Sequence, residues 1–268
     1  MINKDYHVHT DYVDGKDDPE AVVIKAIELG MKEIGFSEHA HVPFDSKYSL
    51  SIDKTNSYIT KIRNLKKKYE GVINILCGIE MDYYSDDRAE NYDYVIGSIH
   101  YLKVGEEIFL IDFSPEHTDY CINKAFKGSR EDFLKCYYEK VALLKEKTEA
   151  NIIGHLDVIS KFENRGIDLS EADNNVKPYW ENAITALSGK CVFEVNTGGM
   201  SRGYKTVPYP DEEKLKFIFK TGGNVVINSD SHSKNTLLYE FENVSGFLRS
   251  IGFEKFGFTD NENIKHCQ

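Results

Sequence analysis

A repeated alternation of strand-like and helix-like segments constrains the fold of this chain more than any other feature. Seven short apolar segments are predicted to be buried strands, and each is followed by a helical pattern or a polar connection. Their residue ranges are 5–9, 33–37, 73–80, 94–100, 151–155, 191–196 and 224–229. This rhythm predicts an α/β fold with parallel strands. The length of 268 residues fits one large domain over residues 1–268 better than two ordinary ones.

Helix signals lie between the predicted strands. One helix is predicted to begin at residues 18–20, where Asp-Pro-Glu gives a start signal, and to end at Gly30. Ser129, with Asp132 three residues later, has the spacing of a capping box and predicts the start of another helix. Residues 103–128 break the rhythm, and we expect them to form an insertion.

The composition argues for a globular protein of the cytoplasm. Hydrophobic residues make up 41% of the chain, and it contains neither a long apolar run nor a basic-then-apolar leader; we therefore expect no membrane partner and no export. The net charge of −11 repels phosphate backbones, so we expect no nucleic acid partner. The five cysteines are odd in number and lack CxxC spacing, which is typical of reduced thiols.

Potential metal ligands follow or end nearly every predicted strand. In a closed parallel barrel the carboxyl ends of all strands meet on one face, so residues scattered along the chain would converge there. A single histidine in such a place is more often structural, and for the pair His7 and His9 taken alone a structural explanation is about as good as a functional site. Six histidines are not well explained by packing. The residues at the strand ends are His7, His9, Glu38, His39, Glu80, His100, His155, Asp230 and His232.

Electrostatics favours metal ions over a dry polar cluster. Carboxylates at Glu80, at Asp230 and near residue 14 would repel one another by about 4 kcal/mol per pair at a separation of about 4 Å and an effective dielectric near 20. Divalent cations remove that cost, and imidazole and carboxylate ligands suit Zn, Fe or Mn. A closed structural zinc site uses four ligands. The larger set predicts two or three ions with a bridging carboxylate, an arrangement that suits phosphoryl transfer.

The order of the short motifs resembles that of a known family. The motifs are HVHT at 7–10, SEH at 37–39, GIE at 78–80, SIH at 98–100, GHLD at 154–157 and SDSH at 229–232. As an ordered set they resemble the polymerase-and-histidinol-phosphatase (PHP) superfamily over essentially the full chain. The resemblance implies a distorted TIM-like (β/α)7 barrel with a trinuclear metal centre.

The resemblance also implies how the ligands divide among three ions. It assigns His7, His9, Glu80 and Asp230 to the first ion, Glu80, His100 and His155 to the second, and Asp14, His39 and His232 to the third. Asp14 is the least secure of these, because Asp11, Asp17 and Asp18 are close rivals.

The single-domain span and the segment GHLDVISKF at 154–162 resemble the histidinol-phosphatase branch of the superfamily. This resemblance implies a hydrolase of histidine biosynthesis that converts L-histidinol phosphate to L-histidinol and phosphate through in-line attack by a metal-bridging hydroxide. Glu80 and Asp230 would then be catalytic through the metals. Arg202 would be catalytic and bind the phosphate, and Arg165 would also bind it, since guanidinium groups match phosphate oxygens.

Three other functions stay open at this point. The same superfamily could act on a nucleotide, a nucleic-acid end or a phosphotyrosine. A metal-binding domain without catalytic activity is a second alternative. An amidohydrolase barrel, which also begins with HxH, is a rival at the level of the fold, although Glu80 followed by SDSH at 229–232 fits it less well.

Overall fold

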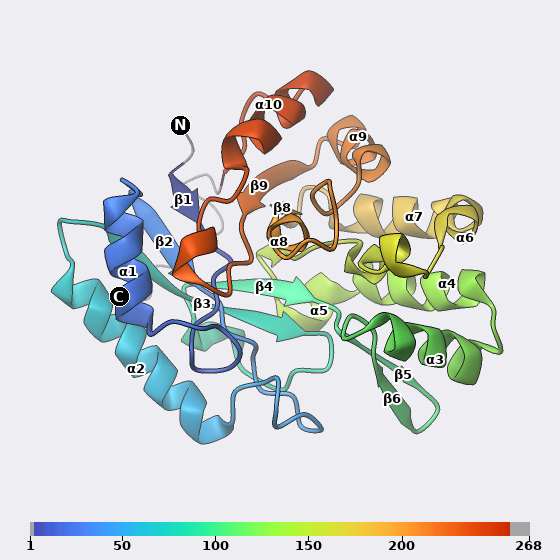
Figure 1. Cartoon of the computed structure of the whole chain (residues 1–268), viewed down its shortest axis with the longest axis horizontal. Coiled ribbons are helices and arrows are strands. Elements are labelled where there is room, and N and C mark those ends of the chain that lie inside the picture. The colour runs from blue at the N-terminus through green and yellow to red at the C-terminus, as the bar shows by residue number, and fades with distance from the viewer. Residues whose placement is uncertain (1–2, 258–268) are drawn as a thin grey trace.

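Seven parallel strands form a nearly closed barrel, as the sequence predicts. The computed structural model describes residues 3–257. The strand order is β1-β2-β3-β4-β7-β8-β9, and every neighbouring pair is parallel. Their bounds are β1 (Lys4–Asp5), β2 (Glu33–Phe36), β3 (Asn74–Asp82), β4 (Tyr94–Ser98), β7 (Ile152–Ile153), β8 (Val192–Asn196) and β9 (Asn224–Asn228). All seven predicted strands are therefore present, although β4 and β7 end before the predicted residues 100 and 155. Figure 1 shows the strands at the centre of the molecule.

Side chains complete the ring where the first and last strands meet. The backbone N–H of Tyr6 donates to Asn228 Oδ1 at 3.0 Å. The backbone N–H of Ser229 donates to Asp5 Oδ1, also at 3.0 Å. These residues are more than 200 positions apart in the chain, so the barrel closes only through contacts between its two ends.

The first strand is shorter than predicted. The sequence predicts a strand over 5–9, whereas β1 ends at Asp5. Because a side-chain oxygen takes the N–H of the next residue, the regular ladder stops there, and only an isolated bridge joins Val8 to Ser231. His7 and His9 therefore follow the first strand rather than end it.

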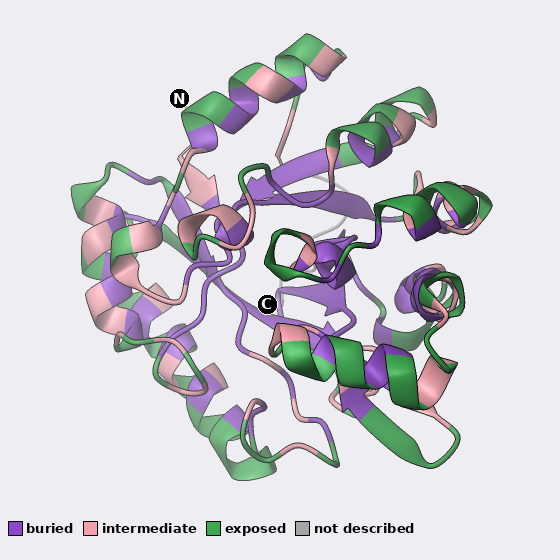
Figure 2. Cartoon of the chain, turned by 45° about the vertical axis from the view of Figure 1, so that its right-hand side comes forward, coloured by how far each residue is buried: buried purple, intermediate pink, exposed green. Residues whose placement is uncertain are grey.

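Helices surround the barrel and turn their buried faces toward the strands (Figure 2). Their bounds are α1 (Pro19–Glu28), α2 (Ile52–Lys68), α3 (Pro115–Phe126), α4 (Arg130–Val141), α5 (Leu144–Thr148), α6 (Ser170–Asn175), α7 (Lys177–Leu187), α8 (Gly198–Ser201), α9 (Glu212–Lys220) and α10 (Phe241–Ile251). Both predicted helix starts are confirmed. Asp18 accepts from the N–H of Glu20 at 2.8 Å, and Ser129 accepts from the N–H of Asp132 at 3.2 Å.

The predicted insertion is a hairpin followed by a helix. Strands β5 (Tyr101–Val104) and β6 (Glu107–Leu110) pair antiparallel and form a sheet of their own. They project from the barrel at the lower right of Figure 1, next to α3. The segment between β6 and α3 returns to the mouth of the barrel and brings Asp112 and Phe113 there.

An apolar layer lies inside the barrel, toward the amino ends of the strands. It consists of Tyr6, Leu76, Tyr94, Ile96, Ile152, Val192 and Val226. Alternate residues of a strand face the same side, so Leu76 and Glu80 of β3 both point inward. The acidic residues therefore lie above a packed apolar floor, near the carboxyl ends of the strands.

No helix within residues 3–257 is long and apolar enough to cross a bilayer. The cysteines of the same range, Cys77, Cys121, Cys136 and Cys191, are free of disulfides, as predicted. Cys267 lies outside the described residues.

Candidate metal centre

The nine predicted ligands meet at the carboxyl ends of the barrel strands. They fall into four overlapping groups, and the ligand atoms within each group lie within 4.8 Å of one another. The groups are His9–Asp14–His39–His232, His7–His155–Asp230, His7–His9–Glu80 and His39–Glu80–His100. The structure therefore brings all nine residues together, as expected for ligands that follow parallel strands.

Glu80 lies at the centre of this cluster. Its side chain is completely buried, and its Oε1 atom lies 2.9 Å from His155 Nε2 and 3.4 Å from His100 Nε2. These two histidines follow β7 and β4, the strands that come after β3 around the barrel. One oxygen of Glu80 thus faces the imidazoles of His155 and His100.

The second oxygen of Glu80 faces a different set of imidazoles. Its Oε2 atom lies 2.9 Å from His39 Nδ1, 3.4 Å from His7 Nε2 and 3.6 Å from His9 Nε2. A carboxylate placed between two groups of imidazoles has the geometry to bridge two cations.

Asp230 stands opposite Glu80 on the same histidine pair. Its Oδ1 atom lies 3.7 Å from His7 Nε2 and 3.5 Å from His9 Nε2. The residue adopts a left-handed backbone conformation, with φ of 48°, which aspartate tolerates better than most side chains. The sharp change of direction after β9 carries Asp230 into the cluster.

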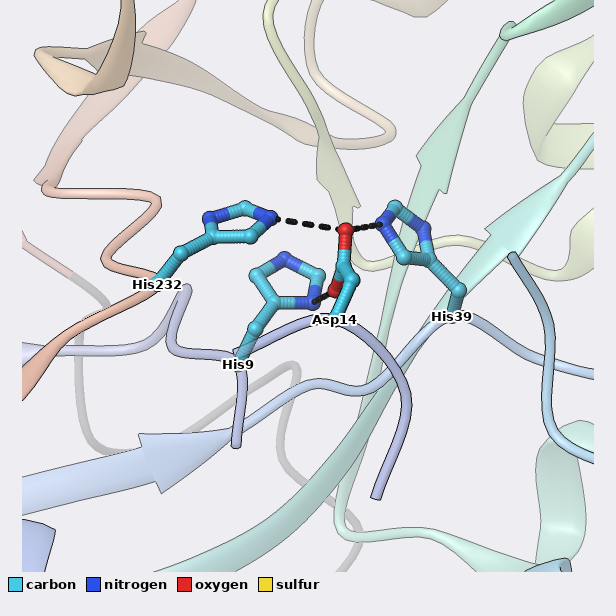
Figure 3. A group of neighbouring side chains, drawn as sticks. All are labelled: His9, Asp14, His39 and His232. Atoms are coloured by element: carbon cyan, nitrogen blue, oxygen red, sulfur yellow. Dashed lines mark hydrogen bonds and ion pairs between the residues drawn. The ribbon is translucent and has the colours of Figure 1, made fainter. Parts of the chain in front are cut away.

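Asp14 joins the cluster from the loop after β1, and Figure 3 shows it between three histidines. Its Oδ2 atom lies 3.1 Å from His232 Nε2 and 3.7 Å from His39 Nε2, and its Oδ1 atom lies 3.8 Å from His9 Nδ1. A carboxylate with two nearby imidazoles from other strands could hold an ion at the outer edge of the cluster.

Two rivals of Asp14 have other partners. Asp17 accepts from the backbone N–H of Lys234 at 2.9 Å, and Asp18 caps α1 and lies 3.1 Å from Lys61 Nζ. Asp14 is the acid from this segment that enters the cluster of potential metal ligands.

Several buried ring nitrogens are left without hydrogen bonds. Within the described part of the chain, His7 Nε2 and both ring nitrogens of His9 have no hydrogen-bond partner. A buried polar atom without a partner costs about 1–3 kcal/mol. Lone pairs of imidazole and carboxylate that converge in a buried place fit divalent metal ions, which would satisfy them.

Charges within the cluster shift its pKa values in opposite directions. Burial lowers the pKa of His9 to about 3, and His232 and His39 act in the same direction. Burial also disfavours protonated His39, but Glu80 and Asp14 outweigh it and raise its pKa well above the ordinary value. For Glu80, burial is outweighed by the surrounding histidines, which hold its pKa well below the usual range. Glu80 is therefore ionised, and positive charge around it stabilises that form.

Arg202 reaches the cluster from the end of α8. Its guanidinium donates to Asp230 Oδ2 and to the backbone oxygen of Asp230, both at 2.8 Å. It also lies 3.0 Å from His232 Nδ1. The side chain remains 31% exposed, so part of the guanidinium faces the open side of the cluster.

Lys161, rather than the predicted Arg165, provides the second cation. Lys161 lines both pockets that adjoin the cluster. Arg165 donates to the backbone oxygen of Gly203 at 3.2 Å. Its guanidinium carbon lies over the ring of Tyr204, 4.5 Å from the ring centroid. The turn after β7 points Arg165 toward a separate surface pocket beside α3, so its position does not support the predicted substrate contact.

Two overlapping pockets adjoin the cluster. The basic pocket is lined by Arg202, Lys161, Tyr204, Tyr209 and Val158 in addition to the predicted ligands. The aromatic pocket is lined by Tyr48, Tyr101, Phe113, Val42, Ala40, Leu110 and Asp82, again in addition to predicted ligands. Asp112 and Lys161 line both pockets and therefore stand at their junction.

Comparisons with known proteins agree on one family. The PHP domain model matches residues 5–198. A Schizosaccharomyces pombe protein named "Probable histidinol-phosphatase" is 28% identical over 257 residues, which cover 87% of this chain and 81% of that protein. Histidinol-phosphatase of Bacillus subtilis is 23% identical over 265 residues, which cover 90% of this chain and 98% of that protein.

A solved structure has the same fold. Histidinol phosphate phosphatase of Lactococcus lactis subsp. lactis, crystallised with Zn, L-histidinol and phosphate, aligns with a TM-score of 0.73 at 21% sequence identity. The alignment covers 98% of each chain.

Proposed function

This chain belongs to the PHP domain family, and from that premise we propose that it hydrolyses L-histidinol phosphate to L-histidinol and phosphate, a reaction of histidine biosynthesis. The observation that carries the proposal is the convergence of nine potential metal ligands, with the buried carboxylate of Glu80 at their centre, beside two cationic side chains. Relatives named as histidinol-phosphatases, aligned over most of the chain, support the choice of substrate.

We infer that the cluster holds two or three divalent ions, with Zn, Fe and Mn as candidates. His7, His9, Glu80 and Asp230 would hold the first, Glu80, His100 and His155 the second, and Asp14, His39 and His232 the third. The zinc in the Lactococcus lactis structure supports zinc as a native metal. Such ions, when bound, polarise phosphoryl oxygens and lower the pKa of water to about 7.

The basic pocket suits the phosphoryl group. Arg202 uses three contacts on Asp230 and His232, and its remaining N–H groups are available to phosphate oxygens. Lys161 Nζ donates to the backbone oxygen and to Oδ2 of Asp112, at 2.7 and 3.2 Å. Both cations are thus held in place before substrate binds, and preorganised charge of this kind stabilises a phosphoryl group in its transition state.

The aromatic pocket suits the leaving group. In L-histidinol phosphate the amine lies two carbons from the ester oxygen, and the imidazole lies farther out. Asp112, at the junction of the two pockets, is placed to meet the amine, while Tyr48 and Phe113 line the outer part and could stack on the imidazole. The site therefore offers an acidic side chain to the amine and aromatic rings to the imidazole of the leaving group.

The remaining predictions about partners are consistent with this substrate. A small phosphate ester needs no extended basic surface, and the net charge of −11 disfavours polynucleotides. A location in the cytoplasm stays a prediction.

A screen of phosphate esters tests the proposal. We expect kcat/KM for L-histidinol phosphate to exceed that for simple alkyl phosphates by at least about 100-fold, a difference of about 2.7 kcal/mol. Removal of metal by a chelator should abolish the activity, and Asp112→Asn should reduce the preference for the amine-bearing substrate.

Three outcomes would contradict parts of the proposal. A flat profile, or a preference for nucleotides or phosphotyrosine, would reject the histidine-pathway substrate. Full activity in a metal-free preparation would reject the metal-dependent reaction. Absence of any phosphatase activity in the metal-loaded protein would favour a metal-binding domain without catalysis.

A further inference from the structure

Strand β8 contributes a carboxylate to the barrel interior without contributing a predicted metal ligand. Each of the other six strands in the described chain contains or precedes at least one member of the cluster. From β8, Glu194 points into the barrel and is fully buried. A buried carboxylate next to a metal centre requires partners that account for its charge.

Four donors surround this carboxylate. Its Oε1 atom lies 2.7 Å from His7 Nδ1 and accepts from Asn228 Nδ2 at 2.9 Å. Its Oε2 atom accepts from the backbone N–H of His155 at 2.8 Å and from Asn196 Nδ2 at 2.8 Å. Glu194 thereby connects β8 to residues of β9 and to the segments that follow β1 and β7.

Backbone groups fix the orientation of both asparagine amides. Asn228 Oδ1 accepts from the N–H of Tyr6 at 3.0 Å, and Asn196 Oδ1 accepts from the N–H of Gly198 at 2.8 Å. Because each amide oxygen is used in this way, each NH₂ group must point toward Glu194. An acceptor with four lone pairs, which only a carboxylate offers, matches this environment.

The same arrangement determines which nitrogen of His7 is available to a metal. With a carboxylate oxygen at 2.7 Å, Nδ1 of His7 carries the proton and donates. Nε2 of His7 then keeps its lone pair, and it is the atom that faces Glu80 and Asp230, at 3.4 and 3.7 Å.

The second contact acts on another part of the centre. Glu194 holds the backbone N–H of His155, and the ring of His155 places Nε2 2.9 Å from Glu80 Oε1. We propose that Glu194 is a positioning residue that orients His7 for the first metal ion and His155 for the second. The inference rests on the proposed metal-dependent function and adds to it a residue that touches neither metal nor substrate.

The variant Glu194→Gln tests the inference. A glutamine would turn an NH₂ group toward two of the four donors, so the orientation of His7 or His155 should be lost. We expect zinc affinity to fall by about 10- to 100-fold, the usual effect of removing a carboxylate that orients a metal-binding histidine. Zinc bound per chain would be measured against buffered free zinc, on protein whose fold is verified by circular dichroism.

Asp93→Asn is the matched control. Asp93 is also buried and accepts from the backbone N–H of Cys77 at 2.9 Å, but it lies at the amino end of β4, away from the cluster. Its substitution should leave zinc affinity unchanged. If both variants lose stability while zinc affinity per folded chain stays at the wild-type level, Glu194 is a structural residue and the inference is wrong.

A second measurement needs no variant. In the zinc-loaded wild-type protein, imidazole nitrogen-15 spectra should show His7 with its proton on Nδ1. A proton on Nε2 would overturn the inference even if the variant fails to fold. Failure of the wild-type protein to bind zinc, iron or manganese would instead reject the proposed function, so the two failures are distinguishable.

Discussion

Glu80 joins imidazoles that follow four different strands, and its substitution is the sharpest test of the centre at the scale of a single residue. We expect Glu80→Gln to remove at least one equivalent of metal per chain and to reduce turnover by several orders of magnitude, because the residue faces two of the proposed ions. Metal analysis and phosphatase assays on the same preparations would measure both effects.

Glu33→Gln provides the control. Glu33 is a buried carboxylate at the amino end of β2, away from the cluster, and its Oε1 atom lies 3.3 Å from Lys4 Nζ. Near-normal metal content and turnover in Glu80→Gln would contradict the bridging role.

The two arginines singled out in the sequence should behave differently. Arg202→Ala should lower kcat/KM by about 100- to 1,000-fold, or about 2.7–4 kcal/mol, as the loss of a charged donor to a transition state does. Arg165→Ala should change kcat/KM only a few-fold, because Arg165 lies behind Tyr204. Because Arg202 also donates to Asp230, metal content must be measured in both variants. Equal kcat/KM values in the two variants would contradict the expected difference between Arg202 and Arg165.

At this scale the sequence predicted which potential ligands lie together better than it predicted which cations line the adjoining pockets. The ligands follow strands, so the regular geometry of the barrel determines where they meet. Lys161 and Arg165 lie in two successive short helical turns after β7. They are four positions apart, and the path of the chain between them, which sequence does not reveal, determines where each side chain points. Glu194 was missed because it lies within a strand and its role depends on neighbours from three other strands.

At the scale of elements, close packing between strands gives a second kind of prediction. Tyr94 of β4 crosses the barrel floor, and its hydroxyl donates to the backbone oxygens of Tyr6 and Phe36 at 2.5 and 3.1 Å. A Cβ atom at Gly78 of β3 would overlap the ring of Tyr94. We expect Gly78→Ala to lower the free energy of unfolding by about 1–3 kcal/mol, the usual cost of overpacking, as measured by denaturant titration.

Gly246→Ala is its control. Gly246 lies within α10 with no atom near its prospective Cβ, so alanine should raise the free energy of unfolding by about 0.5–1 kcal/mol through helix propensity. Equal effects of the two substitutions would show that the ring of Tyr94 can move aside.

The elements themselves were largely predictable. Apolar strands and capped helices carry local signals, and Asp18 and Ser129 cap helices as expected. The early end of β1 was not predictable, because it depends on a hydrogen bond from Tyr6 to Asn228 across 222 positions of the chain.

For the whole molecule, the metal ions should contribute to stability as well as to chemistry. Ligand binding to the folded state alone stabilises it by about 2.7 kcal/mol when the free ligand is at 100 times its Kd. For a chain of this size, each kcal/mol corresponds to about 2–4 °C in Tm. We therefore expect a chelator to lower Tm by about 5–10 °C, and added zinc to restore it, in a thermal unfolding experiment.

The variant Glu80→Gln should show a smaller change in Tm on chelation than the wild-type protein. An unchanged Tm of the wild-type protein after verified metal removal would mean that bound ions do not stabilise the folded chain.

Closure of the barrel by its two ends also determines when, during synthesis, the proposed metal centre can be complete. A ribosome releases His7, His9 and Glu80 early, while Asp230 and His232 follow the last strand. Until β9 docks against β1, the proposed site of the first ion lacks Asp230 and that of the third lacks His232. If the cluster holds metal ions as proposed, all of its ligands can meet only after the last strand has been made and has docked.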